Sequence, residues 1–168
     1  MKDLLMAKDD EKKDLAKTSK APSVGYQKFV KATSGHSKDV SAILNIHLVA
    51  EYYLDQIILI SLPRADVLLN ETRLTFALKL LIVKSLDVVS DDVVASLKGL
   101  NRVRNLCSHE LEYRVTESNI DLIGRPYGKK YTSYKKQYPL DYLQYTLMAP
   151  IAKLEATYDR LHDKSTPD

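Results

Sequence analysis

The chain has 168 residues, 45% of them hydrophobic and 28% charged, with a formal net charge of +3. This suits one ordinary globular domain with a short tail, and the mild charge permits nucleic-acid binding without arguing for it. The single cysteine, Cys107, excludes an internal disulfide and a cysteine-based zinc site, and we interpret it as a small core residue rather than a nucleophile.

Residues 1–22 are rich in Lys and Asp, and we interpret them as a charged arm or a short solvated helix. Residues 23–165 are expected to form a single helical domain. No apolar run reaches the roughly 18 residues of a membrane span. The start of the chain is too acidic for a signal peptide. We therefore expect a cytoplasmic protein that does not contact a membrane.

The first predicted helix of the domain begins after Ser37, a typical N-cap residue, and ends before Pro63. Its apolar residues recur in steps of three and four, which is the pattern of an amphipathic helix. His47, Glu51 and Asp55 occupy every fourth position and form a polar stripe. This stripe is either a solvated face or one side of a functional cleft. It offers too few ligands for a metal.

Two further helices are predicted in the middle of the chain. One runs from Glu71 to Ser85, and the next begins after Ser90 with Asp91 and Asp92 in its first turn, where acids favour the helix dipole. Gly99 lies inside this third helix, at a cost of about 1 kcal/mol relative to alanine. We take it as a sign that another helix approaches closely there.

The last part of the chain contains a capped turn, a basic segment and a helix. Thr116 is expected to cap the turn, and residues 124–139 are predicted to form a basic, tyrosine-rich loop. The final helix runs from Leu140 to Leu161, and Pro150 should kink or split it. These elements together predict an all-α bundle of four to five helices.

The basic loop has two interpretations. It could bind RNA, because lysines neutralise phosphates and tyrosine rings stack on bases. Alternatively, it is a solvated loop whose tyrosines pack on the domain. The candidate RNA-binding residues are Arg102, Arg125, Lys129, Lys130, Lys135, Lys136 and Tyr131.

The most informative segment, residues 104–110, closes the third helix with the sequence Arg-Asn-Leu-Cys-Ser-His-Glu. Arg104 can bind phosphate oxygens through its planar fork. His109 can take a proton from a ribose 2′-hydroxyl, whose oxygen then attacks the adjacent phosphodiester. This reaction needs no metal and no cofactor, and it is confined to RNA. Asn105 would orient His109 or the phosphate.

Helical geometry separates Arg104 from His109 within one chain. Asn105 and His109 are four residues apart and share a face, as do Arg104 and Ser108, whereas Arg104 and His109 lie roughly 140° apart around the helix. Two arrangements would bring them together. Either the helix frays near His109, or His109 meets the motif of a second chain across a two-fold axis.

Residues 40–115 resemble the HEPN superfamily of α-helical nucleic-acid enzymes. The resemblance rests on residues 46–55, 74–79 and 100–109 in this order, and on the Arg-x4-His motif with a polar residue, Asn105, directly after the arginine. It implies a bundle that dimerises through the motif-bearing helix, and metal-independent RNA cleavage. It also implies an acidic residue on an earlier helix, and Glu51 occupies a suitable place. We expect Glu51 to be a partner of Arg104, with His47 and Ser108 supporting the site.

Members of this superfamily differ in function. Many are toxins of toxin–antitoxin pairs or act in phage defence by abortive infection, and we expect this chain to be such a ribonuclease with an antitoxin as partner. The alternative is a non-catalytic binding module or a transcriptional regulator similar to the mannitol-operon repressors. Toxins of this type often carry a tyrosine two residues after the histidine, which the antitoxin modifies. Leu111 stands there in this chain, so regulation by that route is not expected.

Overall fold

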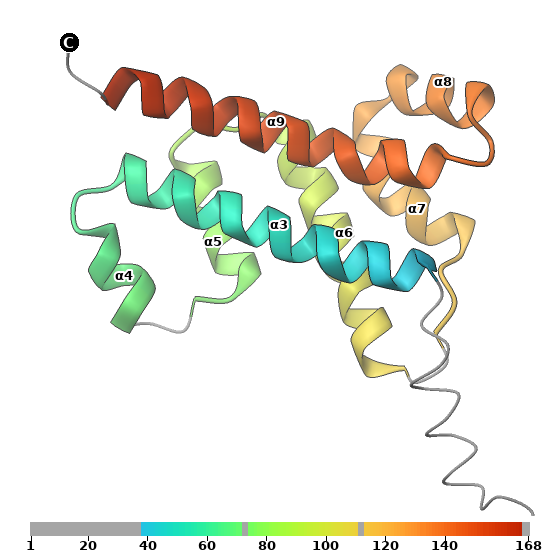
Figure 1. Ribbon diagram of the computed structural model, residues 1–168, viewed down its shortest axis with the longest axis horizontal. Helices are drawn as coiled ribbons and strands as arrows, with labels where there is room; N and C mark the ends of the chain where they lie inside the picture. The colour runs from blue at the N-terminus through green and yellow to red at the C-terminus, as the bar shows by residue number, and fades with distance from the viewer. Residues whose placement is uncertain (1–37, 72–73, 111–112, 166–168) are drawn as a thin grey trace, which may run out of the picture. The chain divides into compact units, whose positions relative to one another are not determined.

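Helices make up all the regular structure in residues 38–71, 74–110 and 113–165, which the computed structural model describes. The expected all-α class is confirmed, with seven α-helices in this part of the chain rather than four to five. The predicted charged arm and Ser37 lie outside the described residues. The elements are α3 (Lys38–Ser61), α4 (Ala65–Glu71), α5 (Phe76–Ser85), α6 (Asp91–His109), α7 (Glu117–Gly124), the short 3-10 helix η1 (Arg125–Tyr127), α8 (Lys129–Gln137) and α9 (Tyr142–Ser165) (Figure 1).

The two longest helices, α3 and α9, lie side by side and run in the same direction (Figure 1). Tyr53 of α3 donates a hydrogen bond to Glu155 of α9 at 3.2 Å, and its ring meets the edge of Tyr158. Helices α5 and α6 also pack on α3, and α7 packs on α6 and α9. Each apolar side chain buried between them contributes about 1.5–3 kcal/mol. The largest fully buried ones include Ile43, Leu54, Ile57, Leu80, Leu97, Leu100, Ile123, Leu147 and Leu154.

The start of α5 is set by Thr75. The hydroxyl of Thr75 accepts a hydrogen bond from the backbone N–H of Leu78 at 3.3 Å, which is the geometry of an N-cap. The predicted start of this helix at Glu71 is therefore wrong, because Glu71 closes the separate helix α4 and α5 begins at Phe76. Helix α6 begins directly after Ser90, as predicted.

Helix α7 begins after Thr116, which caps it as predicted. The side-chain oxygen of Asn119 accepts a hydrogen bond from the backbone N–H of Thr116 at 2.8 Å and completes a capping box. Helix α7 crosses α6 at Gly99, where a Cβ atom would lie 2.3 Å from the backbone oxygen of Leu122. The expected close approach at Gly99 is therefore confirmed.

The structure differs from the expected loop and from the expected split of the last helix. Residues 125–137 form η1 and α8 rather than a loop, because Tyr131 buries its ring and gives the segment an inner face. Helix α9 passes through Pro150 without splitting. Leu147 and Ile151 on either side of the proline are buried, so packing holds the helix together across the missing hydrogen bond.

Helix α3 is long and apolar enough to cross a membrane by length and composition alone, with 33% of its apolar window buried. A core helix of a soluble protein passes the same test. Much of the apolar surface of α3 faces outward. Large exposed hydrophobic residues in the described part of the chain occur on α3 (Leu48, Val49, Tyr52, Leu59), on α5 (Leu78, Leu81) and near or on α9 (Leu140, Tyr145, Met148), but not on α6.

Candidate functional site

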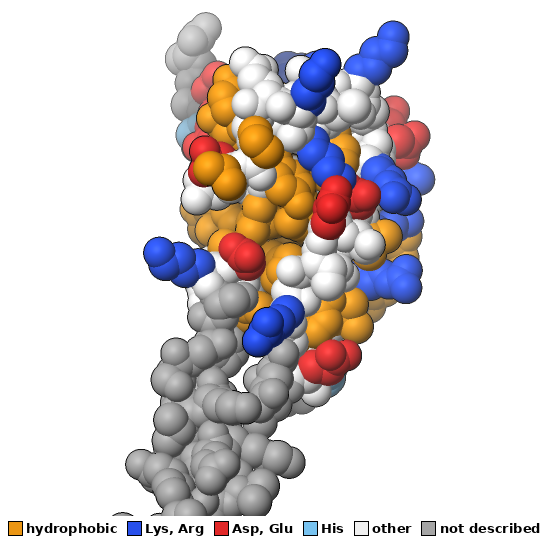
Figure 2. Space-filling model, turned by 90° about the vertical axis from the view of Figure 1, so that its right-hand side faces the viewer, with side chains coloured by type: hydrophobic (Ala, Val, Ile, Leu, Met, Phe, Trp, Pro, Cys, Tyr) orange, Lys and Arg blue, Asp and Glu red, His pale blue; other side chains and the backbone are white. Residues whose placement is uncertain are grey.

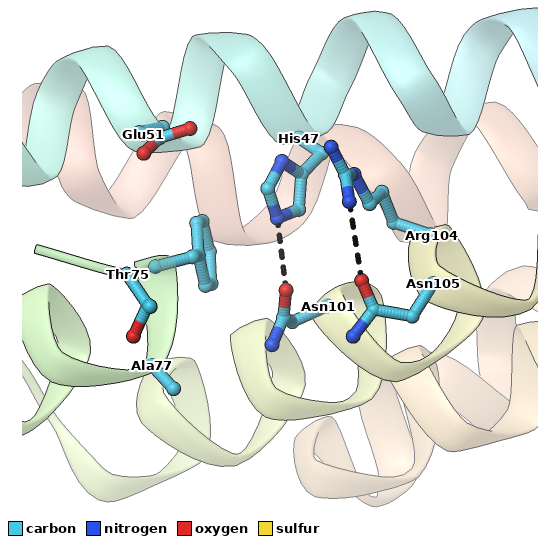
Figure 3. Close-up of a pocket in the computed structure, with 8 residues that line it drawn as sticks. His47, Glu51, Thr75, Ala77, Asn101, Arg104 and Asn105 are labelled. Carbon is cyan, nitrogen blue, oxygen red and sulfur yellow. Dashed lines mark hydrogen bonds between the residues drawn. The ribbon is translucent and has the colours of Figure 1, made fainter. Parts of the chain in front are cut away.

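A pocket of about 400 Å³ opens between α3, the first turn of α5 and α6 (Figure 3). It brings together four of the residues singled out in the sequence. The polar stripe of α3 therefore forms one side of a pocket, and the solvated-face interpretation is wrong for its first two members. The lining residues are His47, Glu51, Thr75, Phe76, Ala77, Asn101, Arg104 and Asn105.

Arg104 and Asn105 reach the pocket from the last two turns of α6. One terminal nitrogen of Arg104, Nη1, donates to Asn105 Oδ1 at 3.2 Å (Figure 3). No acidic partner of Arg104 occurs among the described residues. Because a guanidinium carries five N–H donors, Arg104 retains donors for an anion in the pocket.

Glu51 does not serve as the expected partner of Arg104. Its carboxylate accepts a hydrogen bond from Lys79 of α5, with 2.9 Å between Oε1 and Nζ, and Asp55 lies at the same distance from Nζ. Burial opposes the charge of Lys79, but the hydrogen bonds to Asp55 and Glu51 outweigh it and raise the pKa of the lysine. The proposed Glu51–Arg104 pair is therefore wrong, because Lys79 takes the carboxylate.

His47 forms the inner wall of the pocket. Its ring stacks on Phe76 with 4.2 Å between centroids, and Nε2 lies 3.1 Å from Asn101 Oδ1 (Figure 3). Because an amide oxygen only accepts, this contact places the proton on Nε2. Burial lowers the pKa of His47, and the nearby charge of Arg104 lowers it further against the effect of the Asn101 hydrogen bond. His47 is therefore neutral at pH 7.

We expect His47 to make the protein less stable as the pH falls below about 6.5, the ordinary value for a histidine. The unfolded chain binds a proton there more readily than the folded chain, so protonation favours unfolding. The substitution His47→Gln keeps an N–H donor for Asn101 and removes the titration. Its melting temperature should therefore fall less between pH 7.5 and pH 5 than that of the wild type.

The control for this measurement is Lys98→Gln, which introduces the same residue at an exposed position of α6 and leaves every histidine in place. This variant should keep the wild-type dependence of melting temperature on pH. Equal slopes for His47→Gln and the wild type would show that His47 does not contribute to the acid sensitivity.

His109 does not line the pocket. It is exposed at the last residue of α6, which stays helical up to that point, so the helix does not fray before His109. The expectation that a straight helix separates Arg104 from His109 is confirmed. Ser108 is occupied elsewhere, since its hydroxyl donates to the backbone oxygen of Arg104 at 3.0 Å.

The first turn of α5 faces Arg104 and Asn105 across the pocket through Thr75, Phe76 and Ala77. The first N–H groups of a helix have no partner within it and carry a partial positive charge. With the guanidinium on the opposite wall, this arrangement suits an anion of the size of a phosphate.

No protein-family model, curated protein or solved structure matches the chain. The chemistry of the pocket is therefore the basis for a functional proposal. In the part of the chain that the structure describes, no group of three or more His, Cys, Asp or Glu residues could hold a metal ion.

The predicted RNA-binding residues divide into two groups. Lys135 is paired with Asp121 at 2.9 Å and with Glu117, and the buried Tyr131 bonds the same aspartate through its hydroxyl. The prediction that bases stack on Tyr131 is therefore wrong, because its ring is buried. The residues of the second group are exposed: Arg102, Arg125, Lys129, Lys130 and Lys136. Of these, Arg125 forms an ion pair with Asp121.

Sequence reasoning missed Asn101 and Lys79. Asn101 lies four residues before Asn105 on α6, so helical spacing alone could have placed it on the wall of the pocket. Lys79 carried no such signal, because its role depends on where α5 packs against α3.

Cys107 is buried, which confirms its interpretation as a core residue, and burial raises the pKa of its thiol.

Proposed function

We propose that the protein is a metal-independent endoribonuclease that acts as a homodimer. The observation that supports this most is Arg104, a partly buried cation in a pocket, without an acidic partner among the described residues. Asn105 and the first turn of α5 add neutral donors around the same space. Such a set matches the charge and the oxygen atoms of a phosphodiester.

In the proposed reaction, His109 takes the proton from a ribose 2′-hydroxyl. The 2′-oxygen attacks the neighbouring phosphorus, and the 5′-oxygen of the next nucleotide leaves and takes up a proton. The products are a 2′,3′-cyclic phosphate and a 5′-hydroxyl end. Arg104 binds the phosphate and stabilises the charge that develops on it during the transfer.

We propose a dimer because His109 lies outside the pocket of its own chain. A second copy related by a two-fold axis would supply its His109 to Arg104, and the same exchange would complete the second site. Apolar residues flank the pocket and could be buried between the copies. Leu48 and Tyr52 on α3 and Leu78 on α5 are exposed and directly follow pocket residues in the sequence.

An enzyme of this kind would damage the cell that makes it. We therefore propose a cytoplasmic toxin or phage-defence effector that an antitoxin protein holds in check. This part of the proposal rests on the resemblance to the HEPN superfamily.

The proposal is tested by incubating purified protein with RNA in excess EDTA. We expect the wild type to produce ends with a cyclic phosphate, and Arg104→Ala and His109→Ala each to lower the cleavage rate by about 100-fold or more. A mixture of the two variants should regain up to about a quarter of the activity, because half of the dimers then contain one intact site.

Lys98→Ala is the matched control, because Lys98 is exposed on α6 and outside the pocket. It should cleave at the wild-type rate. Equal, negligible cleavage by the wild type and both variants would refute the ribonuclease proposal. Failure of the mixed variants to regain activity, with an active wild type, would refute the shared site.

A non-catalytic binding module is the second candidate. It is favoured by the position of His109 outside the pocket and by the burial of His47, the histidine within it. The pocket would then hold a phosphorylated ligand without cleaving it. Calorimetry with a mononucleotide would support this candidate if Arg104→Ala lost binding while the wild type left RNA intact.

A further inference from the structure

The outer face of α8 is basic and carries no large apolar side chain. Lys129, Lys130 and Lys136 are exposed, and none has an acidic partner within the described residues. The residues between them on this face are Thr132, Ser133 and Gln137. Lys135 differs from these three lysines, because Glu117 and Asp121 neutralise it.

A stack of three tyrosines lies at the edge of this face. The ring of Tyr145 on α9 packs against Tyr134 and Tyr138, with 5.7 Å and 4.7 Å between centroids. Tyr145 is 42% exposed, so part of the stack is open to solvent. Lys130 is four residues before Tyr134 and therefore on the same side of α8.

Figure 2 shows the end of the domain where α7 and α8 lie. Lys and Arg side chains gather over the upper and right-hand part of this face, around a central hydrophobic patch. Acidic side chains also occur there. Glu117 and Asp121 of α7 are engaged by Lys135, whereas Asp141, four residues after α8, is exposed.

We infer that the outer face of α8 and the tyrosine stack, which we call the α8 surface, bind single-stranded RNA. The inference deepens the proposed function and rests on it for the identity of the polymer. Lysines contact the phosphates, and an exposed tyrosine ring offers a face on which an unpaired base stacks. The surface is separate from the pocket, since no residue of the α8 surface lines the pocket.

The shape of the surface favours RNA over the other polyanions. A duplex keeps its bases stacked inside and could use only the lysines. A helix that lies in a membrane buries an apolar face beside its basic one. On α8 itself the residues between the three lysines are polar, and Tyr131 on the inward face is packed in the domain.

The test measures binding of the full-length protein to a labelled 12-nucleotide 2′-O-methyl oligouridine, which cannot be cleaved through a 2′-hydroxyl. The variant Lys129→Gln/Lys130→Gln/Lys136→Gln should bind about tenfold more weakly in fluorescence anisotropy. Its plot of log affinity against log salt should be shallower by about 2, which corresponds to three lost phosphate contacts. Tyr145→Ala should weaken binding about fivefold or more, through the lost stacking.

The matched control is Lys84→Gln/Lys98→Gln/Lys164→Gln, which removes three exposed lysines elsewhere and the same total charge. It should bind nearly as the wild type does. Equal losses in the two triple variants, or equal affinity for a duplex of the same length, would overturn the inference. It would also be overturned if phosphatidylserine vesicles bound the wild type and lost binding to the α8 triple variant while the oligonucleotide was unaffected.

This experiment separates the α8 surface from the ribonuclease. If the protein binds the oligonucleotide through α8 but leaves ordinary RNA intact, the RNA-binding role of the α8 surface is supported and the ribonuclease proposal is refuted. If the protein cleaves RNA while both triple variants bind the oligonucleotide alike, the ribonuclease proposal is supported and the RNA-binding role of the α8 surface is refuted. Thermal melts of all variants check that each remains folded.

Discussion

Gly99→Ala is expected to lower the free energy of unfolding by about 3 kcal/mol, a large effect for a single methyl group. The new Cβ would lie 2.3 Å from the backbone oxygen of Leu122 and 2.8 Å from its carbonyl carbon. A backbone group cannot rotate away as a side chain can, so α6 and α7 would have to separate. The gain of about 1 kcal/mol in helix propensity from alanine is too small to offset this. Urea denaturation followed by circular dichroism measures the loss.

The control is Lys98→Ala, which introduces the same residue at the preceding, exposed position of α6. Its free energy of unfolding should stay within about 0.5 kcal/mol of the wild type. If Gly99→Ala were as stable as Lys98→Ala, the close crossing of α6 and α7 would be wrong.

Lys79→Met is expected to lower the free energy of unfolding by about 2–3 kcal/mol. Lys79 is 9% exposed and neutralises Glu51 and Asp55, which lie four residues apart on α3. Its removal leaves two like charges beside each other without a cation. The loss should stay below the value for a fully buried pair because the two carboxylate side chains are 31% and 30% exposed, which allows some hydration.

Lys84→Met is the matched control on the same helix. Lys84 pairs with Asp91 at 3.2 Å, but both side chains are well exposed, so its removal should cost less than about 1 kcal/mol. Adding Glu51→Gln and Asp55→Asn to Lys79→Met should recover part of the lost stability, since the repulsion disappears. Equal melting curves for Lys79→Met and Lys84→Met would contradict the role of Lys79.

The fold was predicted best where local signals agree with packing. Apolar spacing predicted α3 and α6, and the capping residue Thr116 predicted the start of α7, because its side chain accepts from a backbone N–H within one turn of its own position. Helix α8 was missed because its apolar spacing is weak, and only the burial of Tyr131 against the domain makes it a helix with two faces. Periodicity over short, charged segments does not contain that information.

The candidate site was predicted in part for the same reason. Arg104 and Asn105 share one helix, and their distance from His109 follows from helical geometry. Which residues pair across different helices could not be predicted from the sequence. The sequence pointed to Arg104 as the cation for Glu51, whereas the packing of α5 on α3 places Lys79 there. The ribonuclease activity, the dimer and the antitoxin remain predictions.

The pairing of α3 with α9 has a consequence for synthesis on the ribosome. These helices form the most extensive contact in the described part of the domain, yet they lie at its two ends in the sequence. At roughly 5–20 residues per second, α3 waits on the order of ten seconds for its partner to be translated. Until then the part of α3 that α9 covers faces solvent together with its exposed apolar residues, so we expect the nascent chain to be a substrate for ribosome-associated chaperones until α9 has emerged.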